Sequence, residues 1–444
     1  MHFNKILQML DSSPYLSVGL DVGADFTWMS IALPNGSFWG KPFKIIHDDP
    51  YSREMAVAKI KEAQELYSLK SRCFLESTGI YHVPLLCFLR DKGLDCSVIN
   101  PIITKNSTNI NIRKLHNDKF DSKKAALVGL NASLKTSIIP DEDIADLRNL
   151  VRDYYYFKDL QSAVVLKLNA ELKLSFPAYL KVFSKITTQS SLKLLAAYPL
   201  AKDMLAAPKE ELVGIIRSTA RFGKAYALSR YEAILEAAKD AAVFGRALPS
   251  NAVRIRLYIG SYQTYQKHLD SLLLALHEAV DKLQGTPVYD RICLLQSLRG
   301  VGFLSAVVLM AEMGDFDLFP SPKKLYAYFG LDPAVKQSGK LNGDKVHMSK
   351  RGSSLARRVL HMAALNNLKV DKGTKAPVNP VIYNYYTGKC ASKKKNVAVG
   401  AVMHKICNII FAMLRYNKPF EIIPPQMHCK QYALNHPASV TNAA

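Results

Sequence analysis

The stretch Ser17–Gly23, which reads SVGLDVG, is an apolar segment that carries one acidic residue, Asp21, near its end. Short apolar runs of this kind are typical of buried β-strands. A carboxylate at the carboxyl end of a core strand is costly to remove from water unless it binds a partner. The central question is therefore what Asp21 binds and which other residues share that partner.

The segments around Asp21 predict a mixed sheet. Five strands are expected, at Leu16–Asp21, Trp28–Leu33, Phe38–Ile46, Cys73–Glu76 and Cys96–Asn100. The first three follow one another closely, and a Pro-Asn-Gly turn joins the second to the third, which indicates antiparallel pairing. Helices expected at 52–66 and 81–92 separate the last three strands, and strand–helix–strand spacing is typical of a parallel crossover. This is the layout of a ribonuclease-H-like sheet.

The rest of the chain predicts helices, so the expected fold class is α/β plus α. A helix is expected at Asp118–Leu130, and residues 140–176 and 251–284 read as two long amphipathic helices that can pair as a coiled-coil arm. The expected domains are a sheet domain at 1–139, the arm at 140–286 with a helical insertion at about 181–250, a mainly α domain at 287–420, and a tail at 421–444.

The overall charge indicates a polyanionic partner. The chain of 444 residues has 59 Lys and Arg against 37 Asp and Glu, a formal net charge of +22. An excess of this size is typical of proteins that bind nucleic acid. A generic basic surface or a ribosome-associated protein is the alternative interpretation.

The cysteines and apolar runs predict a soluble, cytoplasmic protein. The 7 cysteines form no C-x-x-C pair, which argues against a disulfide framework or a cysteine zinc site. The first ten residues, MHFNKILQML, lack the apolar core of a signal peptide. The longest apolar runs, such as Phe303–Ala311, are about half as long as a membrane span. No membrane partner is expected.

Four acidic residues form a candidate metal site. Asp21 and Glu76 each end a predicted strand, and Asp118 and Asp121 are three apart at a predicted helix start, which places them on one face. Four clustered carboxylates repel one another unless divalent cations lie among them, and oxygen-only ligands favour Mg²⁺, with Mn²⁺ as the alternative. Taken singly, Asp21 could cap a turn, Glu76 could be the end of a surface strand, and Asp118 could be a helix N-cap.

The C-terminal part carries candidate nucleic-acid contacts. Residues 294–313 suggest a helix–hairpin–helix whose Gly300 and Gly302 could offer backbone N–H groups to a phosphate, although glycine hairpins also serve close packing. Between Leu341 and Phe420 there are 15 Lys and Arg against 2 Asp and Glu. Cations interleaved with tyrosines suit backbone contacts and base stacking. The candidate basic contacts are Lys340, Lys350, Arg351, Arg357, Arg358, Lys393, Lys394 and Lys395. A solvated basic face is the alternative.

Ser338 lies in the loop segment QSGK, beside a glycine. Such a serine can present its hydroxyl with little steric hindrance, but a nucleophilic serine needs a base or a metal to weaken its O–H bond. Only Asp344 and His347 are nearby in sequence. The residues alone therefore do not assign catalysis to Ser338.

Taken together, these segments resemble the DEDD transposases of the IS-one-ten type of insertion sequence, also called bridge-RNA-guided recombinases. The motifs that carry the resemblance are GLDVG, FLESTGIYHVPL, SVINP, the D-x-x-D at 118–121, LRGVGFLSAVVLMAEMGDFDLF, LYAYFGLDPAVKQSGK and MSKRGSSLARRVLHMAA. They span roughly residues 15–130 and 290–415, in the order of the family. The departures are Ser122, where the family usually has Ala, a long insertion at 181–250, and an unusually polar segment at 102–117.

The resemblance implies a RuvC-like N-terminal domain, a coiled-coil linker and a C-terminal transposase domain. It implies that Asp21, Glu76, Asp118 and Asp121 bind Mg²⁺ and that Ser338 is a nucleophile that forms a phosphoserine link to DNA. It further implies a structured non-coding bridge RNA that pairs with target and donor DNA, and homodimers or tetramers with a composite site. The location would be the bacterial cytoplasm, in association with the nucleoid.

The sequence therefore predicts an RNA-guided DNA recombinase or transposase. A metal-dependent nuclease or Holliday-junction resolvase that uses the same carboxylates with water is the first alternative. A non-catalytic nucleic-acid-binding protein is the second.

Overall fold

The structure, a computed structural model, describes residues 15–77, 80–99, 118–131, 134, 141–219, 223–334, 337–338, 341–342, 347–424, 426–427, 429–430 and 434. The expectations for the first ten residues, for 102–117 and for most of the tail lie outside the described residues. The chain forms two units, Met1–Ile139 and Pro140–Ala444, and each is described by itself.

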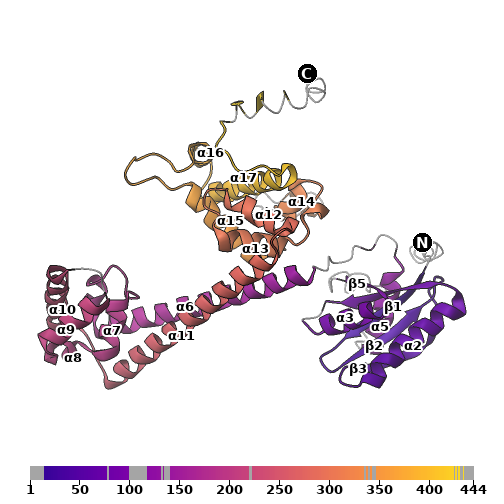
Figure 1. Ribbon diagram of the computed structural model, residues 1–444, viewed down its shortest axis with the longest axis horizontal. Coiled ribbons are helices and arrows are strands. Elements are labelled where there is room, and N and C mark those ends of the chain that lie inside the picture. Colours follow the sequence, from indigo (N-terminus) through magenta and orange to yellow (C-terminus); the bar gives the residue numbers. More distant parts are fainter. Residues whose placement is uncertain are drawn as a thin grey trace. The chain divides into compact units, whose positions relative to one another are not determined.

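The first unit contains the predicted mixed sheet (Figure 1). Its strands are β1 (Tyr15–Val22), β2 (Phe26–Ala32), β3 (Phe38–Ile46), β4 (Lys70–Glu76) and β5 (Asp95–Ile99). Their order is β3-β2-β1-β4-β5. β1 pairs antiparallel with β2 and parallel with β4, β2 pairs antiparallel with β3, and β4 pairs parallel with β5. The strand pairing is consistent with a ribonuclease-H-like domain.

The alternation of side chains along β1 separates the two faces of the sheet. Leu16, Val18 and Leu20 are buried in a core with side chains from α2 (Pro50–Tyr67) and α3 (His82–Asp91). The intervening residues face α5 (Asp118–Gly129), which packs against β1 and β2. This alternation follows from the two-residue period of a strand, and it places Asp21 on the face that α5 covers.

Small residues let α5 lie directly on the sheet. A Cβ atom on Gly19 would lie 2.1 Å from the backbone nitrogen of Ala126 and 2.2 Å from the carbonyl oxygen of Ser122. Nearby, the Ser17 hydroxyl donates to the Ala126 carbonyl at 2.6 Å, and the Ser30 and Ser122 hydroxyls are 2.8 Å apart. The glycine and the serines therefore fix the height and the register of α5 over β1 and β2.

The second unit begins with two long helices that pack along each other, α6 (Glu142–Ser175) and α11 (Pro249–Lys282). Between them in sequence lie η1 (Pro177–Lys181), α7 (Gln189–Ala197), α8 (Ala201–Ala206), α9 (Lys209–Thr219) and α10 (Lys224–Phe244). These short helices share a hydrophobic core with one end of α6 and α11, in which Phe176 and Tyr179 are fully buried. The helices between α6 and α11 thus form a small bundle whose core includes side chains of both long helices.

The C-terminal helices form another core (Figure 1). They are α12 (Pro287–Gln296), α13 (Phe303–Met313), η2 (Phe316–Leu318), α14 (Pro322–Tyr328), α15 (Ser354–Asn367), α16 (Pro380–Cys390) and α17 (Lys395–Tyr416). A bidentate ion pair joins this core to α6: Arg152 Nε and Nη2 lie 2.9 and 3.1 Å from the two carboxylate oxygens of Glu312. The Glu312 side chain is only 3% exposed, so its charge depends on this arginine.

Helix α17 was not predicted from the sequence. Among the described residues it is the one helix that is long and apolar enough to cross a membrane, but 56% of its apolar stretch is buried inside the protein. It packs against α12, α14, α15 and α16, as the central helix of a folded core does. The three lysines at 393–395 were predicted to belong to a basic surface, and no helix was predicted from the apolar pattern that follows them.

Candidate active site

The strand register brings two of the predicted acidic residues together. The last paired residues of β1 and β4 are Leu20 and Leu75, so Asp21 and Glu76 follow as neighbours on adjacent strands. Because Leu20 and Leu75 both point into the core under α2 and α3, Asp21 and Glu76 lie on the opposite face, which α5 covers. On its other side Asp21 pairs with Trp28 of β2.

The other two acidic residues come from the first turn of α5. Asp118 and Asp121 are both in this turn, and the close contact at Gly19 holds the helix against β1. Asp121 accepts a hydrogen bond from Lys124 Nζ at 2.7 Å, an ion pair between residues three apart on the helix. Lys124 was not among the predicted site residues, although the D-x-x-K spacing is a sufficient signal for such a pair.

The four carboxylates interact electrostatically. Burial, followed by the negative charges of Asp121, Asp118 and Glu76, raises the pKa of Asp21 to about 7 from a usual value of 3.8. The positive charge of Lys124 partly opposes this shift. Each of the three predicted partners is therefore close enough to Asp21 to change its ionisation.

The donor set fits a hard divalent cation. Only carboxylate oxygens contribute, and these are the ligands that Mg²⁺ and Mn²⁺ prefer. In the described part of the chain, no three His, Cys, Asp or Glu side chains lie together closely enough to form a ready metal site, and Asp121 is paired with Lys124 instead. The fit therefore rests on the chemistry of the donors and on their mutual repulsion.

Ser338 lies at the end of a short strand. Strands β6 (Gln337–Ser338) and β7 (Leu341–Asn342) pair antiparallel, with Ser338 opposite Leu341. Ser338 is therefore the last residue of β6, and two positions of the sequence separate it from the start of β7. Lys340, a predicted nucleic-acid contact, and the loop residue Asp344 lie outside the described residues.

The base of the serine loop is well anchored. The Ala334 N–H donates to the His347 carbonyl, and the Ser349 N–H donates to the Asp332 carbonyl, both at 2.7 Å. A Cβ atom on Gly352 would lie 1.9 Å from the Tyr328 carbonyl oxygen, so only glycine permits this chain crossing. The two ends of the loop are thus held side by side.

The predicted nucleic-acid residues have different surroundings. Lys350, Arg351 and the three lysines at 393–395 are exposed. Arg357, in contrast, donates to the carbonyls of Phe329 and Gly352, and burial lowers its pKa. Arg358 pairs with Asp159 of α6 at 2.8 Å. These two arginines therefore have structural partners within the protein.

The two hairpin glycines also differ. Gly300 has φ +82°, and a Cβ atom there would lie 2.7 Å from Cβ of Asn366 on α15. Close packing therefore accounts for Gly300. Gly302 precedes the first turn of α13 and has no heavy atom within 4 Å of the position of a Cβ. Of the two, Gly302 leaves more room for a phosphate.

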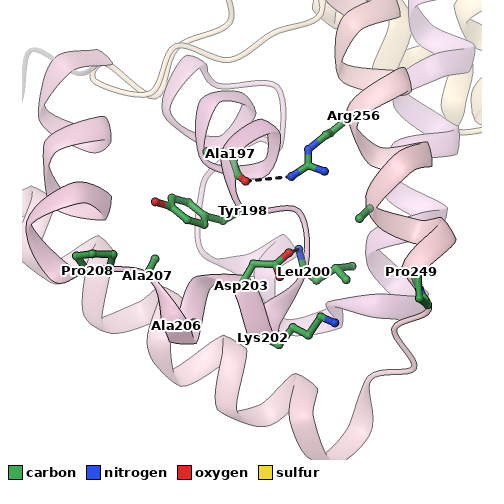
Figure 2. A pocket seen from close by; sticks show the side chains of 11 residues that line it. Ala197, Tyr198, Leu200, Lys202, Asp203, Ala206, Ala207, Pro208, Pro249 and Arg256 are labelled. Carbon is green, nitrogen blue, oxygen red and sulfur yellow. Dashed lines mark hydrogen bonds between the residues drawn. The ribbon is translucent and has the colours of Figure 1, made fainter.

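A hollow of about 560 Å³ lies between the insertion helices and α11, and none of the predicted site residues lines it. Figure 2 shows its walls, in which Arg256 points toward the carbonyl of Ala197. Arg256 donates to the carbonyls of Ala196 and Ala197 at 3.0 and 3.2 Å. Its guanidinium group therefore supplies hydrogen bonds to the last two carbonyl groups of α7.

Comparisons with known proteins match both ends of the chain. A profile of DEDD transposases of the IS110 type, described as "Transposase", matches residues 18–177, and the "Transposase IS116/IS110/IS902 family" matches residues 293–379. The first match contains all four acidic residues, and the second contains Ser338.

Curated relatives match in part. The chain is 30% identical over 123 residues to an uncharacterized 43.6 kDa protein of insertion element IS110 from Streptomyces coelicolor, covering 27% of this chain and 28% of that protein. It is 26% identical over 170 residues to a pilin gene-inverting protein from Moraxella bovis, covering 38% of this chain and 51% of that protein. A protein of insertion element IS900 from Mycobacterium paratuberculosis is 28% identical over 153 residues, or 34% of this chain and 32% of that protein.

The matched region thus spans between 28% and 51% of the length of these relatives. The two family matches nevertheless cover separate parts of the chain in the order that the resemblance predicts. The chain belongs to the IS110 family of DEDD transposases.

Proposed function

We propose that this protein is an RNA-guided DNA recombinase that acts as a transposase. The observation that carries the proposal is the electrostatic coupling of Asp21 to Glu76, Asp118 and Asp121 in one unit of a chain whose family includes transposases. The relative named a pilin gene-inverting protein also supports a recombination reaction.

The proposed architecture has three functional parts and a tail. Residues 1–139 form a RuvC-like domain that holds the carboxylates. Residues 140–286 form a coiled-coil arm with the insertion, and residues 287–420 form a transposase domain with a helix–hairpin–helix and the serine loop. The packing of α6 along α11, and the short connection between α12 and α13, support this division.

In the proposed reaction, Asp21, Glu76, Asp118 and Asp121 hold Mg²⁺, for which Mn²⁺ could substitute. When bound, the metal supplies positive charge that stabilises the attacking and leaving oxygens of a phosphodiester transfer. Ser338 Oγ forms a bond to the phosphorus and loses its proton. The bond from phosphorus to a deoxyribose oxygen breaks, and that oxygen takes up a proton. Attack by the hydroxyl of another strand end would later release Ser338.

The proposed partners are target DNA, donor DNA and a structured non-coding RNA that pairs with both. The concentration of positive charge between 341 and 420 supports contacts to nucleic-acid backbones, while base pairing would supply the sequence specificity. We further propose that the protein works as a dimer or tetramer in the bacterial cytoplasm, in association with the nucleoid.

The test is to incubate the protein with Mg²⁺, the RNA that co-purifies with it and labelled DNA, and to separate the products under denaturing conditions. We expect a covalent protein–DNA species that is absent with Ser338→Ala and with Asp21→Ala. Ser338→Ala should still bind the nucleic acids. Normal strand exchange by Ser338→Ala would refute the nucleophile assignment, and cleavage without any adduct would favour a nuclease or resolvase that uses water.

A further inference from the structure

A row of residues crosses the sheet at the level of the acidic site. The register pairs Lys44 with Trp28 and Trp28 with Asp21, and Glu76 follows on β4 with Ile99 beside it on β5. Residues that pair directly across strands share a face, so Trp28 lies beside Asp21 and Lys44 lies one strand further on the same face of the sheet. On the β2 and β3 side, therefore, the acidic site is next to an aromatic ring and a cation.

Two lysines of α5 extend this surface. Lys119 Nζ lies 4.7 Å from the centre of the Trp28 ring, and Lys123 Nζ lies 5.0 Å from the centre of the Phe38 ring. On β3, Lys44 Nζ lies 4.0 Å from the centre of the Phe26 ring. We call the three lysines and three rings the lysine–aromatic strip; its members are Phe26, Trp28, Phe38, Lys44, Lys119 and Lys123.

The charges of α5 divide between two sides of the acidic site. Lys124 is paired with Asp121, and its charge acts on Asp21. Lys119 and Lys123 contact rings of β2 and β3. They are four residues apart and therefore about 6 Å apart at their Cβ atoms, a separation comparable with that of successive phosphates along one strand.

A polyanion cannot approach four carboxylates without cations near them, because like charges repel. On the other side of Asp21, the row continues with Glu76 and Ile99, neither of which is a cation. The strip thus supplies positive charge on one side of the acidic site. Each ring also restrains the lysine above it, which lowers the entropic cost of binding a phosphate.

We propose that the lysine–aromatic strip binds the single DNA strand that leads to the phosphate held at the acidic site. Lys119 and Lys123 contact consecutive phosphates, Lys44 contacts the sugar–phosphate chain further along β3, and Trp28 orients Lys119. The identity of the strand rests on the proposed function, whereas the binding itself does not depend on catalysis. The proposed contacts lie in the first unit and add to the basic contacts predicted near the C-terminus.

Tryptophan fluorescence gives a local readout, because the chain has only two tryptophans, Trp28 and Trp39. Trp39 pairs with Ile31 and packs partly buried against the core on the α2 side of the sheet, although it also lines a small hollow with Lys123. In full-length Trp39→Phe protein, titration with oligothymidylate in EDTA should change the emission of Trp28 saturably. In Trp28→Phe protein, the emission of Trp39 should change much less than the emission of Trp28 does in Trp39→Phe protein.

In the Trp39→Phe background, the Lys119→Gln/Lys123→Gln double variant should need at least tenfold more oligothymidylate for half-saturation. The slope of log affinity against log salt should fall by about 1.4, because two phosphate contacts to a single strand are lost. Lys119→Arg/Lys123→Arg keeps both charges and should restore most of the affinity. Lys59→Gln is the matched control, since Lys59 Nζ lies 5.5 Å from the centre of the Phe43 ring and both residues belong to the α2 side of the sheet.

The proposal would be overturned if the double variant and its parent were half-saturated at the same concentration of oligothymidylate. It would also be overturned if oligothymidylate changed the emission of Trp39 and not that of Trp28. If the glutamine variant does not fold, the arginine variant and Lys119→Gln alone provide the same comparison. If the protein forms no covalent adduct although oligothymidylate still changes the emission of Trp28, the proposed function is contradicted and the proposal for the lysine–aromatic strip stands. If the glutamine double variant forms the adduct normally at limiting DNA, the proposal for the strip is contradicted and the proposed function stands.

Discussion

Asp21 is a residue whose surroundings oppose its own charge. It is half-buried, and this burial, together with the negative charges of three other carboxylates, raises its pKa to about 7. Only Lys124 acts in the other direction. Active sites commonly carry such strain, because groups that bind a ligand well are poorly satisfied without it.

Replacing this carboxylate should therefore stabilise the metal-free protein. The pKa of Asp21 is higher in the folded state than in the unfolded state, so its ionisation costs stability, fully above about pH 7 and not at all below about pH 4. Allowing for solvent screening, we expect Asp21→Asn to be more stable by about 1–2 kcal/mol at pH 8, with a smaller gain at pH 5. Urea unfolding in EDTA, followed by tryptophan emission, measures the first unit.

Magnesium provides the control for this prediction. Mg²⁺ should raise the unfolding midpoint of the natural protein at pH 8 and should have a much smaller effect on Asp21→Asn, because a ligand that binds only the folded state stabilises it. A variant that is less stable than the natural protein at pH 8 in EDTA would contradict the repulsion argument.

At the scale of elements, the site depends on how α5 lies on the sheet. Strand periodicity predicts β1 and β4 and places Asp21 and Glu76 at their ends, because a two-residue period is a local property of the sequence. Neither the contact between Lys119 and Trp28 nor the packing of Gly19 under α5 can be read from such a period. Both depend on the height and angle at which the helix crosses the strands.

A single methyl group on Gly19 should disrupt this arrangement. In Gly19→Ala the new Cβ would lie 2.1 and 2.2 Å from two backbone atoms of α5, so the helix must move away, and Asp118 and Asp121 must move with it. We expect a loss of about 3 kcal/mol in stability and loss of strand exchange. Urea unfolding and the adduct assay measure the two effects.

The matched control is Gly260→Ala in α11, where no heavy atom lies within 4 Å of the position of a Cβ. This change should leave activity intact and should stabilise the helix by up to about 1 kcal/mol. A fully active and stable Gly19→Ala protein would show that α5 does not need its close contact with β1.

The basic residues near the C-terminus show why charge alone is a weak guide to function. The sequence contains Arg357 and Arg358 in an apparently exposed basic helix, yet one donates to backbone carbonyls and the other pairs with Asp159. Helix α17 was overlooked for a related reason: its lysine-rich start masks an apolar pattern that becomes part of a core only when α12, α14, α15 and α16 pack against it. Such partners are tertiary, and no local pattern specifies them.

At the scale of the whole molecule, the carboxylates and the serine belong to different units. All four acidic residues lie within Met1–Ile139, whereas Ser338 lies within Pro140–Ala444. Under the proposed function, a working site needs both units, and they can come from one protomer or from two. Mutant mixing distinguishes these cases, because each defect can be confined to one unit.

We expect a mixture of Asp21→Ala and Ser338→Ala proteins to regain activity that neither has alone. If the site is composite, a mixed dimer contains one site with intact carboxylates from one protomer and an intact serine from the other. Half of the dimers are mixed after random exchange, so recovery should approach about a quarter of the natural activity. The measurement is the yield of covalent adduct at constant total protein, with subunit exchange followed by differently labelled protomers.

The control is a mixture of Asp21→Ala and Glu76→Ala proteins. Both changes damage the same unit, so every composite site in a mixed dimer lacks one carboxylate and no activity should return. Recovery in the first mixture and not in the second would assign the two halves of the site to different protomers. Complete inactivity of the first mixture, with subunit exchange demonstrated, would instead mean that each chain closes its own site and that the assembly serves to join DNA partners.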